Sequence, residues 1–293
     1  MSENSTFITF KKERDLGAII TDTFKFIRNN WKDYFMTIIK IVGPVLILAI
    51  VAVIGMLSSF GDLFQNLQNQ QNPDPTQVFS GILPWYGVMI IAFLLLYTLM
   101  SMASLYFIKY YIENQGQHSF DYVKNQVLDN FWRYLGLGAL ITISVIIGLL
   151  FCILPGYYLL IVLSLATPIL VFENKGAVDS FSHAFTLIKG QWWNTFGVII
   201  VIGLLVGVLG SVFSIPSFIY QMVKMATGIS ENDPTQMFTL FKDPIYIVLN
   251  VLSYTFQFML YSVTMISGVF IYYDLNEQKN LSGTIEQIEN LGA

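Results

Sequence analysis

Six long apolar runs constrain the fold of this chain more than any other feature. They cover residues 34–60, 84–108, 135–153, 155–172, 194–222 and 244–273. A helix needs about 20 apolar residues to cross the hydrocarbon core of a bilayer. The runs also lack the strict alternation of polar and apolar residues that marks the strands of a membrane barrel. The sequence therefore predicts an all-α integral membrane protein with six transmembrane helices.

The composition agrees with this class. Hydrophobic residues make up 55% of the chain and charged residues 12%, and the mean hydropathy is +0.61. A soluble domain carries roughly 25% charged residues, so this chain has too few polar side chains to cover a water-soluble globule. The net charge of −4 argues against nucleic acid as a partner. We expect membrane lipids to be the main partners.

The distribution of basic residues predicts the orientation. Thirteen of the fifteen Lys and Arg residues fall before or just inside the first run, between the second and third, between the fourth and fifth, or in the tail. Lys224 and Lys242 lie on the opposite side. Basic residues collect on the cytoplasmic side of a membrane protein. We therefore expect a multi-pass protein of a bacterial inner membrane, with both termini cytoplasmic.

Three cytoplasmic segments have the spacing of amphipathic helices and each ends at tryptophan. They are residues 16–31, 120–132 and 177–192, with apolar residues on one face. The tryptophans Trp31, Trp132, Trp192 and the adjacent Trp193 are predicted interfacial anchors, because an indole buries its ring and keeps an N–H for headgroups. Asn29, Asn130 and Gly190 stand two residues before them, where a left-handed residue would end each helix. Cytosolic loops with chance periodicity are the alternative.

Each of these helices leads into two apolar runs, which predicts three transmembrane hairpins in a single membrane domain, 1–293. The expected units are 13–112, 118–172 and 175–275, followed by a cytoplasmic tail, 276–293. In the middle unit a Pro155–Gly156 turn is expected to join the two spans.

A short polar phrase occurs twice and indicates internal duplication. Residues 74–79 read DPTQVF and residues 233–238 read DPTQMF. Parallel copies of this kind are usually related by an axis along the membrane normal. Asp74 and Asp233 are predicted helix caps, because Asp is favoured at the N-cap and Pro at the first helical position. Each outer loop should then carry a short helix of its own. Joint binding of a cation or an amine by the two aspartates is the alternative.

One polar stripe runs along the sixth apolar run. Its members recur every three or four residues and are Asn250, Tyr254, Gln257, Tyr261 and Thr264. Polar side chains in a span must face protein or a wet cavity. Hydrogen bonds between helices are one interpretation, and the wall of a substrate or lipid groove is the other. Lys40 lies inside the first run, where it would snorkel to the headgroups or contact an anionic lipid.

The residues that reactions and metals require are not evident in the sequence. His118 and His183 have no Glu or Cys at metal-ligand spacing. No glycine-rich phosphate loop, nucleophile elbow or HExxH motif occurs. We therefore predict no cofactor, no metal site and no catalytic residues.

The stretch Leu154–Gly197 resembles the membrane domain attached to some glycerophosphoryl diester phosphodiesterases and related bacterial membrane proteins. Pro155-Gly156, Pro168, Glu173, Leu187, Gly190, Trp193 and Phe196 carry the resemblance. Relatives often have Arg-Ser where this chain has His183-Ala184. The N-terminal stretch 11–35 resembles uncharacterised multi-span proteins of Bacteroidota. The resemblance implies a membrane domain whose biochemical role is unknown, and it carries no phosphodiesterase activity because no catalytic domain is attached.

Three functions are compatible with these features. The leading hypothesis is a non-enzymatic protein that engages lipid or a lipid-like substrate, in transport or membrane homeostasis. The second is a scaffold subunit that docks a membrane-protein partner through its cytoplasmic helices. The third is a lipid-modifying enzyme, which would need convergent titratable groups in an enclosed cavity.

Overall fold

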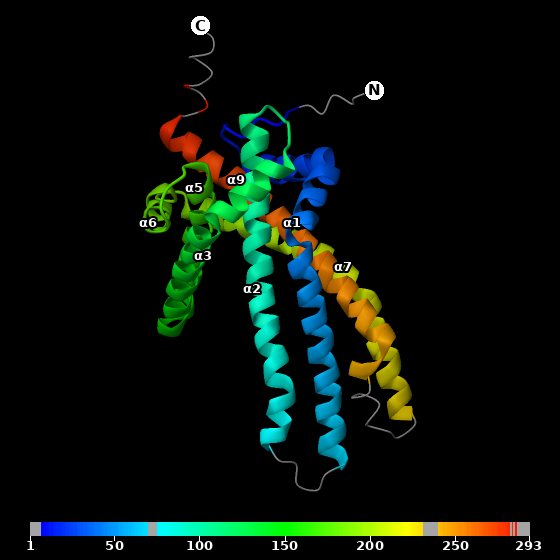
Figure 1. Cartoon of the computed structure of the whole chain (residues 1–293). Coiled ribbons are helices and arrows are strands. Elements are labelled where there is room, and N and C mark those ends of the chain that lie inside the picture. Colours follow the sequence, from blue (N-terminus) through cyan, green and yellow to red (C-terminus); the bar gives the residue numbers. More distant parts are fainter. Residues whose placement is uncertain (1–6, 70–74, 231–239, 282, 284, 286–293) are drawn as a thin grey trace, which may run out of the picture. The chain divides into compact units, whose positions relative to one another are not determined.

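A computed structural model describes residues 7–69, 75–230, 240–281, 283 and 285 (Figure 1). These ranges contain helices and no strand. The elements are α1 (Leu16–Asn69), α2 (Pro75–Glu113), α3 (Phe120–Phe151), α4 (Ile153–Leu163), α5 (Ala166–Phe172), α6 (Ala177–Leu187), α7 (Trp192–Ser230), the short 3-10 helix η1 (Leu240–Lys242) and α9 (Pro244–Asn280).

Six helical stretches in the described ranges are long and apolar enough to cross a membrane. They are Leu16–Leu63, Ser80–Glu113, Phe120–Phe151, Ile153–Phe172, Trp192–Thr227 and Pro244–Asn280. Each coincides with one of the six predicted runs. The structure thus confirms an all-helical chain with six membrane-length apolar helices.

The chain divides into two compact units. Unit 1 takes the residues up to Ile41, Thr98–Leu205 and those from Ser262 on, and unit 2 takes Val42–Tyr97 and Val206–Tyr261. The helices α1, α2, α7 and α9 contribute to both units, whereas α3 to α6 belong to unit 1.

Aromatic side chains form the centre of unit 1. Phe10, which precedes α1, is 1% exposed and stacks on Phe270 of α9, with ring centroids 4.3 Å apart. Phe26 and Tyr34 of α1 are fully buried, and the Tyr34 hydroxyl donates to Ser104 Oγ of α2 at 2.8 Å. Burial of such large rings is a main source of stability in a packed core.

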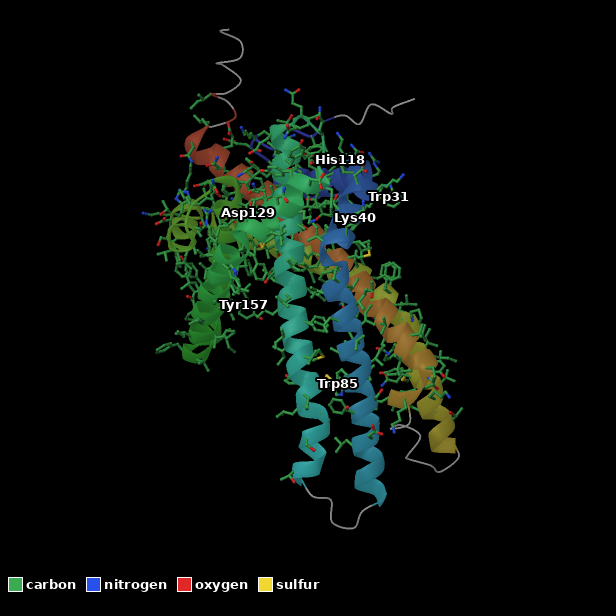
Figure 2. All side chains as sticks on the ribbon, in the orientation of Figure 1. Trp31, Lys40, Trp85, His118, Asp129 and Tyr157 are labelled. Carbon is green, nitrogen blue, oxygen red and sulfur yellow. The ribbon has the colours of Figure 1, made fainter. Side chains whose placement is uncertain are left out.

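Small residues let helices approach closely in both units. In unit 1 a Cβ built on Gly148 of α3 would lie 3.1 Å from Gly156 Cα of α4. In unit 2 a Cβ built on Gly55 of α1 would lie 2.4 Å from the Trp85 ring of α2, which points toward α1 (Figure 2). These contacts fit the rule that small residues mediate helix packing in membranes.

Two of the three predicted amphipathic helices do not end where the sequence suggested. The helix α1 continues through Asn29 and Trp31, and α3 continues through Asn130 and Trp132. Asparagine adopts the left-handed conformation less freely than glycine. The Asn130 amide instead donates to the Gln126 carbonyl one turn earlier, at 3.0 Å, which is compatible with an uninterrupted helix.

The third predicted end is confirmed. The helix α6 ends at Leu187, Gly190 has a φ of +87°, and α7 begins at Trp192. Glycine pays no steric penalty at positive φ because it has no Cβ. The chain therefore breaks at the one glycine among the three equivalent positions.

The sequence predicts the turn between the third and fourth runs at Pro155–Gly156, and this prediction is wrong. The turn lies at Cys152. Cys152 has extended backbone, with φ −170° and ψ 151°, whereas Pro155 and Gly156 lie inside the first turn of α4. Pro155 has no N–H to donate to the Phe151 carbonyl, so a helix that continued from α3 would lose a hydrogen bond here. Pro155 is tolerated where it stands because the first turn of a helix leaves its N–H groups unbonded.

The fourth run is likewise interrupted, between α4 and α5. Pro168 has no N–H for the carbonyl of Ser164, and the helix breaks at Ser164 and Leu165. The Ser164 hydroxyl donates to the Ile161 carbonyl at 2.7 Å, which satisfies one of the carbonyls at the end of α4.

The first outer loop does not carry a separate short helix. Residues 78–82 belong to the beginning of α2, which starts at Pro75 and runs without interruption through Pro84. The start at Pro75 agrees with the predicted first helical position. Asp74, Asp233 and the second copy of the phrase lie outside the described residues.

The positive φ of Gly190 generates a stability prediction. Gly190→Ala should lower the free energy of unfolding by about 1 kcal/mol, because any side chain strains a left-handed residue. Gly136→Ala is the matched control, since Gly136 lies inside α3 and an added Cβ would meet nothing within 4 Å. It should be neutral or stabilising. Thermal and denaturant unfolding of the purified variants, followed by circular dichroism, would measure both. An equal loss of unfolding free energy in the two variants would contradict the conclusion that Gly190 needs its left-handed conformation.

Candidate functional site

The predicted polar stripe lies on α9 and is divided between the two units. Asn250, Tyr254, Gln257 and Tyr261 belong to unit 2, and Thr264 belongs to unit 1. A single groove wall of all five residues is therefore not what the structure describes. Each residue is considered below within its own unit.

Three of the four stripe residues in unit 2 contact their own helix or a neighbouring one. The Asn250 amide donates to the Tyr246 carbonyl of its own helix at 2.8 Å. The Gln257 side chain lies beside Gly210 of α7, with Nε2 3.5 Å from where a Cβ would stand. Tyr261 packs on Tyr97 of α2, with ring centroids 4.8 Å apart. The contacts of Gln257 and Tyr261 agree with the interpretation that the stripe holds helices together, whereas the Asn250 bond lies within its own helix.

Tyr254 differs from these residues because it lines a groove. The groove measures about 30 Å³ and lies between α1, α2 and α9 in unit 2. Its lining is Leu46, Ala49, Ile50, Val53, Phe93, Leu96, Val251, Tyr254, Thr255 and Phe258. The Thr255 hydroxyl donates to the Val251 carbonyl at 2.7 Å, so it is turned back onto its own helix. The structure thus places the half-exposed Tyr254 among the lining residues of a narrow apolar groove.

Lys40 does not line this groove. It belongs to unit 1, where it is exposed and its ammonium lies 5.3 Å from the centroid of the Phe120 ring (Figure 2). A cation over an aromatic face is favourable by about 0.5–1 kcal/mol at an exposed site. The charge therefore has a partner at the start of α3.

The four tryptophans have two kinds of environment. Trp31, Trp132 and Trp193 are 60%, 79% and 75% exposed. Trp192 is largely buried and stacks on Phe196 and Tyr158, with centroids 5.1 and 5.7 Å away. Its indole nitrogen is buried, and no described residue accepts a hydrogen bond from it.

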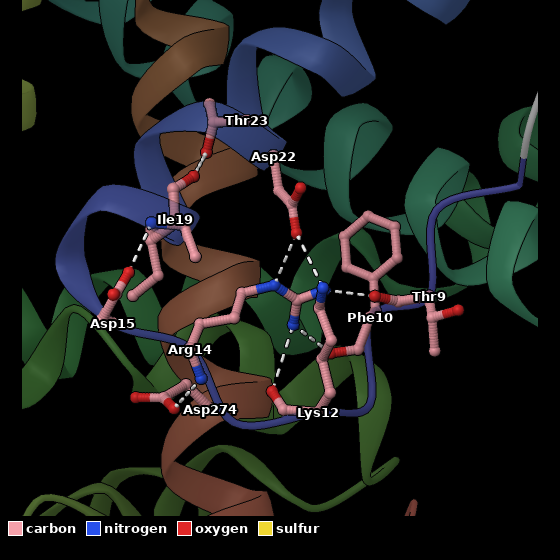
Figure 3. A network of polar contacts seen from close by, with 10 residues as sticks. Thr9, Phe10, Lys12, Arg14, Asp15, Ile19, Asp22, Thr23 and Asp274 are labelled. Atoms are coloured by element: carbon pink, nitrogen blue, oxygen red, sulfur yellow. Dashed lines mark hydrogen bonds and ion pairs between the residues drawn. The ribbon is translucent and has the colours of Figure 1, made fainter.

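A buried arginine organises the segment that precedes α1, all within unit 1 (Figure 3). The Arg14 guanidinium donates to the carbonyls of Thr9, Phe10 and Lys12, and its Nε donates to Asp22 at 2.9 Å. The Arg14 backbone N–H donates to Asp274 of α9 at 2.7 Å. The guanidinium also lies 4.7 Å from the centroid of the Phe270 ring. A planar group with five donors is suited to such a node.

Burial lowers the pKa of the Arg14 guanidinium, and the hydrogen bond and charge of Asp22 oppose this shift. Arginine stays protonated in proteins, so the node keeps its charge at neutral pH. Its donors are directed at protein carbonyls and a carboxylate, which indicates a structural role.

Two acidic residues that the sequence analysis did not assign to a site are centres of polar contacts. Glu173 in unit 1 accepts from Tyr272 at 3.0 Å and pairs with Lys175 at 2.6 Å and His183 at 3.4 Å. Asp243 in unit 2 accepts from Tyr220 at 2.7 Å. The described residues contain no group of three or more His, Cys, Asp or Glu side chains placed to hold a metal.

Asp243 also caps α9. Its carboxylate accepts from the Ile245 N–H at 2.9 Å, and Pro244 is the first helical residue. Burial acts to raise the pKa of the Asp243 carboxyl, but hydrogen bonds from Tyr220 and Lys224 outweigh it and hold the pKa below its ordinary value. The sequence contains a signal for this cap in the pair Asp243–Pro244. The sequence analysis interpreted the same pair of residue types as a helix cap at Asp74 and Asp233.

Comparison with known proteins gives one match. A family model described as a domain of unknown function, DUF7847, matches residues 130–275. The matched stretch begins inside α3 and ends inside α9, and it leaves α1 and α2 outside. No curated protein and no solved structure matches the chain.

The contacts of Arg14 generate a second prediction. Arg14→Lys should lower the free energy of unfolding by about 2 kcal/mol, because lysine cannot reproduce the planar fork of donors and leaves buried carbonyls unbonded. Lys12→Gln is the control, since its ion pair with Asp22 is half exposed. Such pairs contribute about 0–1 kcal/mol. Denaturant titration in detergent would separate the two. Similar unfolding midpoints for both variants would show that Arg14 does not hold the segment before α1 in place.

Proposed function

We propose that this protein is a non-enzymatic, multi-pass protein of a bacterial inner membrane that engages lipid, in transport or membrane homeostasis. The observation that carries the proposal is the groove of unit 2. Apolar side chains form most of its lining, and Tyr254 is the tyrosine among the lining residues. Lipid-binding sites combine apolar walls with a few placed polar groups.

An acyl chain is the occupant that fits this groove best. The groove is narrow, and exposed apolar residues such as Ile47 and Leu252 lie close to its lining residues in sequence. A surface of this kind is suited to hydrocarbon. Burial of one methylene group, which is what about 30 Å³ can hold, contributes about 0.8 kcal/mol to retention.

The architecture in the membrane is part of the proposal. The six apolar helices would form three hairpins with both termini in the cytoplasm, and the first and third hairpins would be related as internal repeats. Residues 16–31, 120–132 and 177–187 would form an interfacial collar. The exposed Trp31, Trp132 and Trp193 support such a collar, since indoles favour the membrane–water boundary. The resemblance of Leu154–Gly197 to phosphodiesterase-linked membrane domains is compatible with this picture.

The same exposed tryptophans favour one second candidate. Three indoles that are each at least 60% exposed could dock another membrane protein, because tryptophan is enriched at interaction hot spots. In that case the protein would be a scaffold subunit. Loss of a co-purifying protein partner in Trp132→Ala, with lipid retention unchanged, would favour the scaffold over lipid engagement.

The lipid proposal predicts the effect of filling the groove. Val53→Trp should lower the amount of co-purifying phospholipid about fourfold, because the groove of about 30 Å³ holds roughly one methylene group, whose burial contributes about 0.8 kcal/mol. Val51→Trp is the matched control, since Val51 lies on the same helix, is 48% exposed and does not line the groove. Mass spectrometry of lipid extracted from equal amounts of protein gives the comparison.

A second pair of variants tests the phenol. Tyr254→Phe should lower retention by a few-fold, the effect of one neutral hydrogen bond of about 0.5–1.5 kcal/mol. Tyr86→Phe, at a 47% exposed position of unit 2 outside the lining, should have no effect. If Val53→Trp and Tyr254→Phe both retained lipid like the parent protein, the groove would not be the site.

A further inference from the structure

Unit 1 contains a cavity that the acyl-chain groove does not involve. It measures about 510 Å³ and lies where the end of α2 meets the segment before α1, α5 and α9. Small-molecule sites occupy about 300–1,000 Å³, so the cavity is large enough for a phosphorylated headgroup. Lys11, Lys109 and Thr9 are among the polar residues of its lining, and Phe172 and Tyr273 are among the aromatic ones.

Lys109 is held in position at this cavity. Its ammonium donates to the Val171 carbonyl at 2.8 Å. An ammonium has three N–H donors, so this bond uses one of them. Lys109 directly follows the apolar run 84–108, which places it at headgroup depth in any bilayer that α2 crosses.

The charge of the lining is suited to an anion. The lining contains two basic residues, Lys11 and Lys109, and one acidic residue, the exposed Glu113. A second cavity of unit 1, of about 340 Å³, is lined by Asp15 and Asp274 as well as Arg14, whose donors are directed at protein oxygens. Two carboxylates repel an anion, so the two cavities differ in the charge that they would accept.

We propose that the cavity of about 510 Å³ binds a phosphate group, carried by a phospholipid headgroup or by a free phosphate ester. Lys11 and Lys109 are its cationic partners, since lysine binds phosphate as a mobile point charge with rotatable donors. Phe172 and Tyr273 also line the cavity and would contact the remainder of the molecule. This site is independent of the acyl-chain groove, and either proposal can fail without the other.

Binding to the full chain in detergent micelles tests the proposal with three probes. They are short-chain phosphatidylglycerol, glycerol 1-phosphate, and diacylglycerol with the same chains as the phospholipid. Lys11→Gln and Lys109→Gln should each weaken phosphatidylglycerol binding about tenfold, the effect of one lost charge-assisted hydrogen bond. Lys124→Gln is the matched control, because Lys124 is exposed on α3 and outside the lining.

The probes also distinguish the two sources of phosphate. Lysine-dependent binding of phosphatidylglycerol alone would identify a lipid headgroup as the ligand, whereas lysine-dependent binding of glycerol 1-phosphate as well would identify a free ester. Undiminished phosphatidylglycerol binding by Lys11→Gln would overturn the proposal, as would equal affinity for diacylglycerol or no lysine-dependent binding of any probe. Lys11 precedes the first helix, so its variant remains informative if Lys109→Gln unfolds more readily.

Discussion

The buried guanidinium of Arg14 is the interaction on which the arrangement of unit 1 depends. The segment from Thr9 to Lys12 has few regular backbone partners, and the guanidinium supplies hydrogen bonds to its carbonyls. This places Phe10 in the aromatic core against Phe270. A buried charge is stable when its donors are satisfied, and here carbonyls and the Asp22 carboxylate satisfy them. The segment before α1 is therefore part of the core.

Proline acts in two different ways along the chain. Pro155 and Pro168 coincide with breaks, because the carbonyls that they leave unbonded lie at the ends of α3 and α4. Pro44, Pro84 and Pro216 lie inside long helices. Such prolines are tolerated in membrane helices when neighbouring groups satisfy the released carbonyl. Residue type alone thus does not decide whether a helix ends.

The sequence predicted the six apolar helices because their signal is local and long. It also predicted the break at Gly190, where only glycine avoids strain. It was wrong at Asn29 and Asn130, because asparagine is compatible with both a helix end and a helix interior. The division of the α9 stripe between two units depends on contacts distant in sequence, as do the contacts of Arg14 with Asp274. Periodicity cannot reveal such contacts, and only Tyr254 of the predicted stripe reached the groove.

The stacking of Phe10 on Phe270 has a consequence for biosynthesis. The two rings are 260 positions apart and come from the two ends of the chain. A ribosome adds about 5–20 residues per second, so Phe10 waits roughly 10–50 s for its partner. The apolar helices of unit 2 are synthesised during this time, while Phe10 does not yet have Phe270 to pack against. Contacts with such long sequence separation form late and slowly. The core of unit 1 can therefore be completed only after α9 has been synthesised. The segment around Phe10 is then among the last parts of unit 1 to pack.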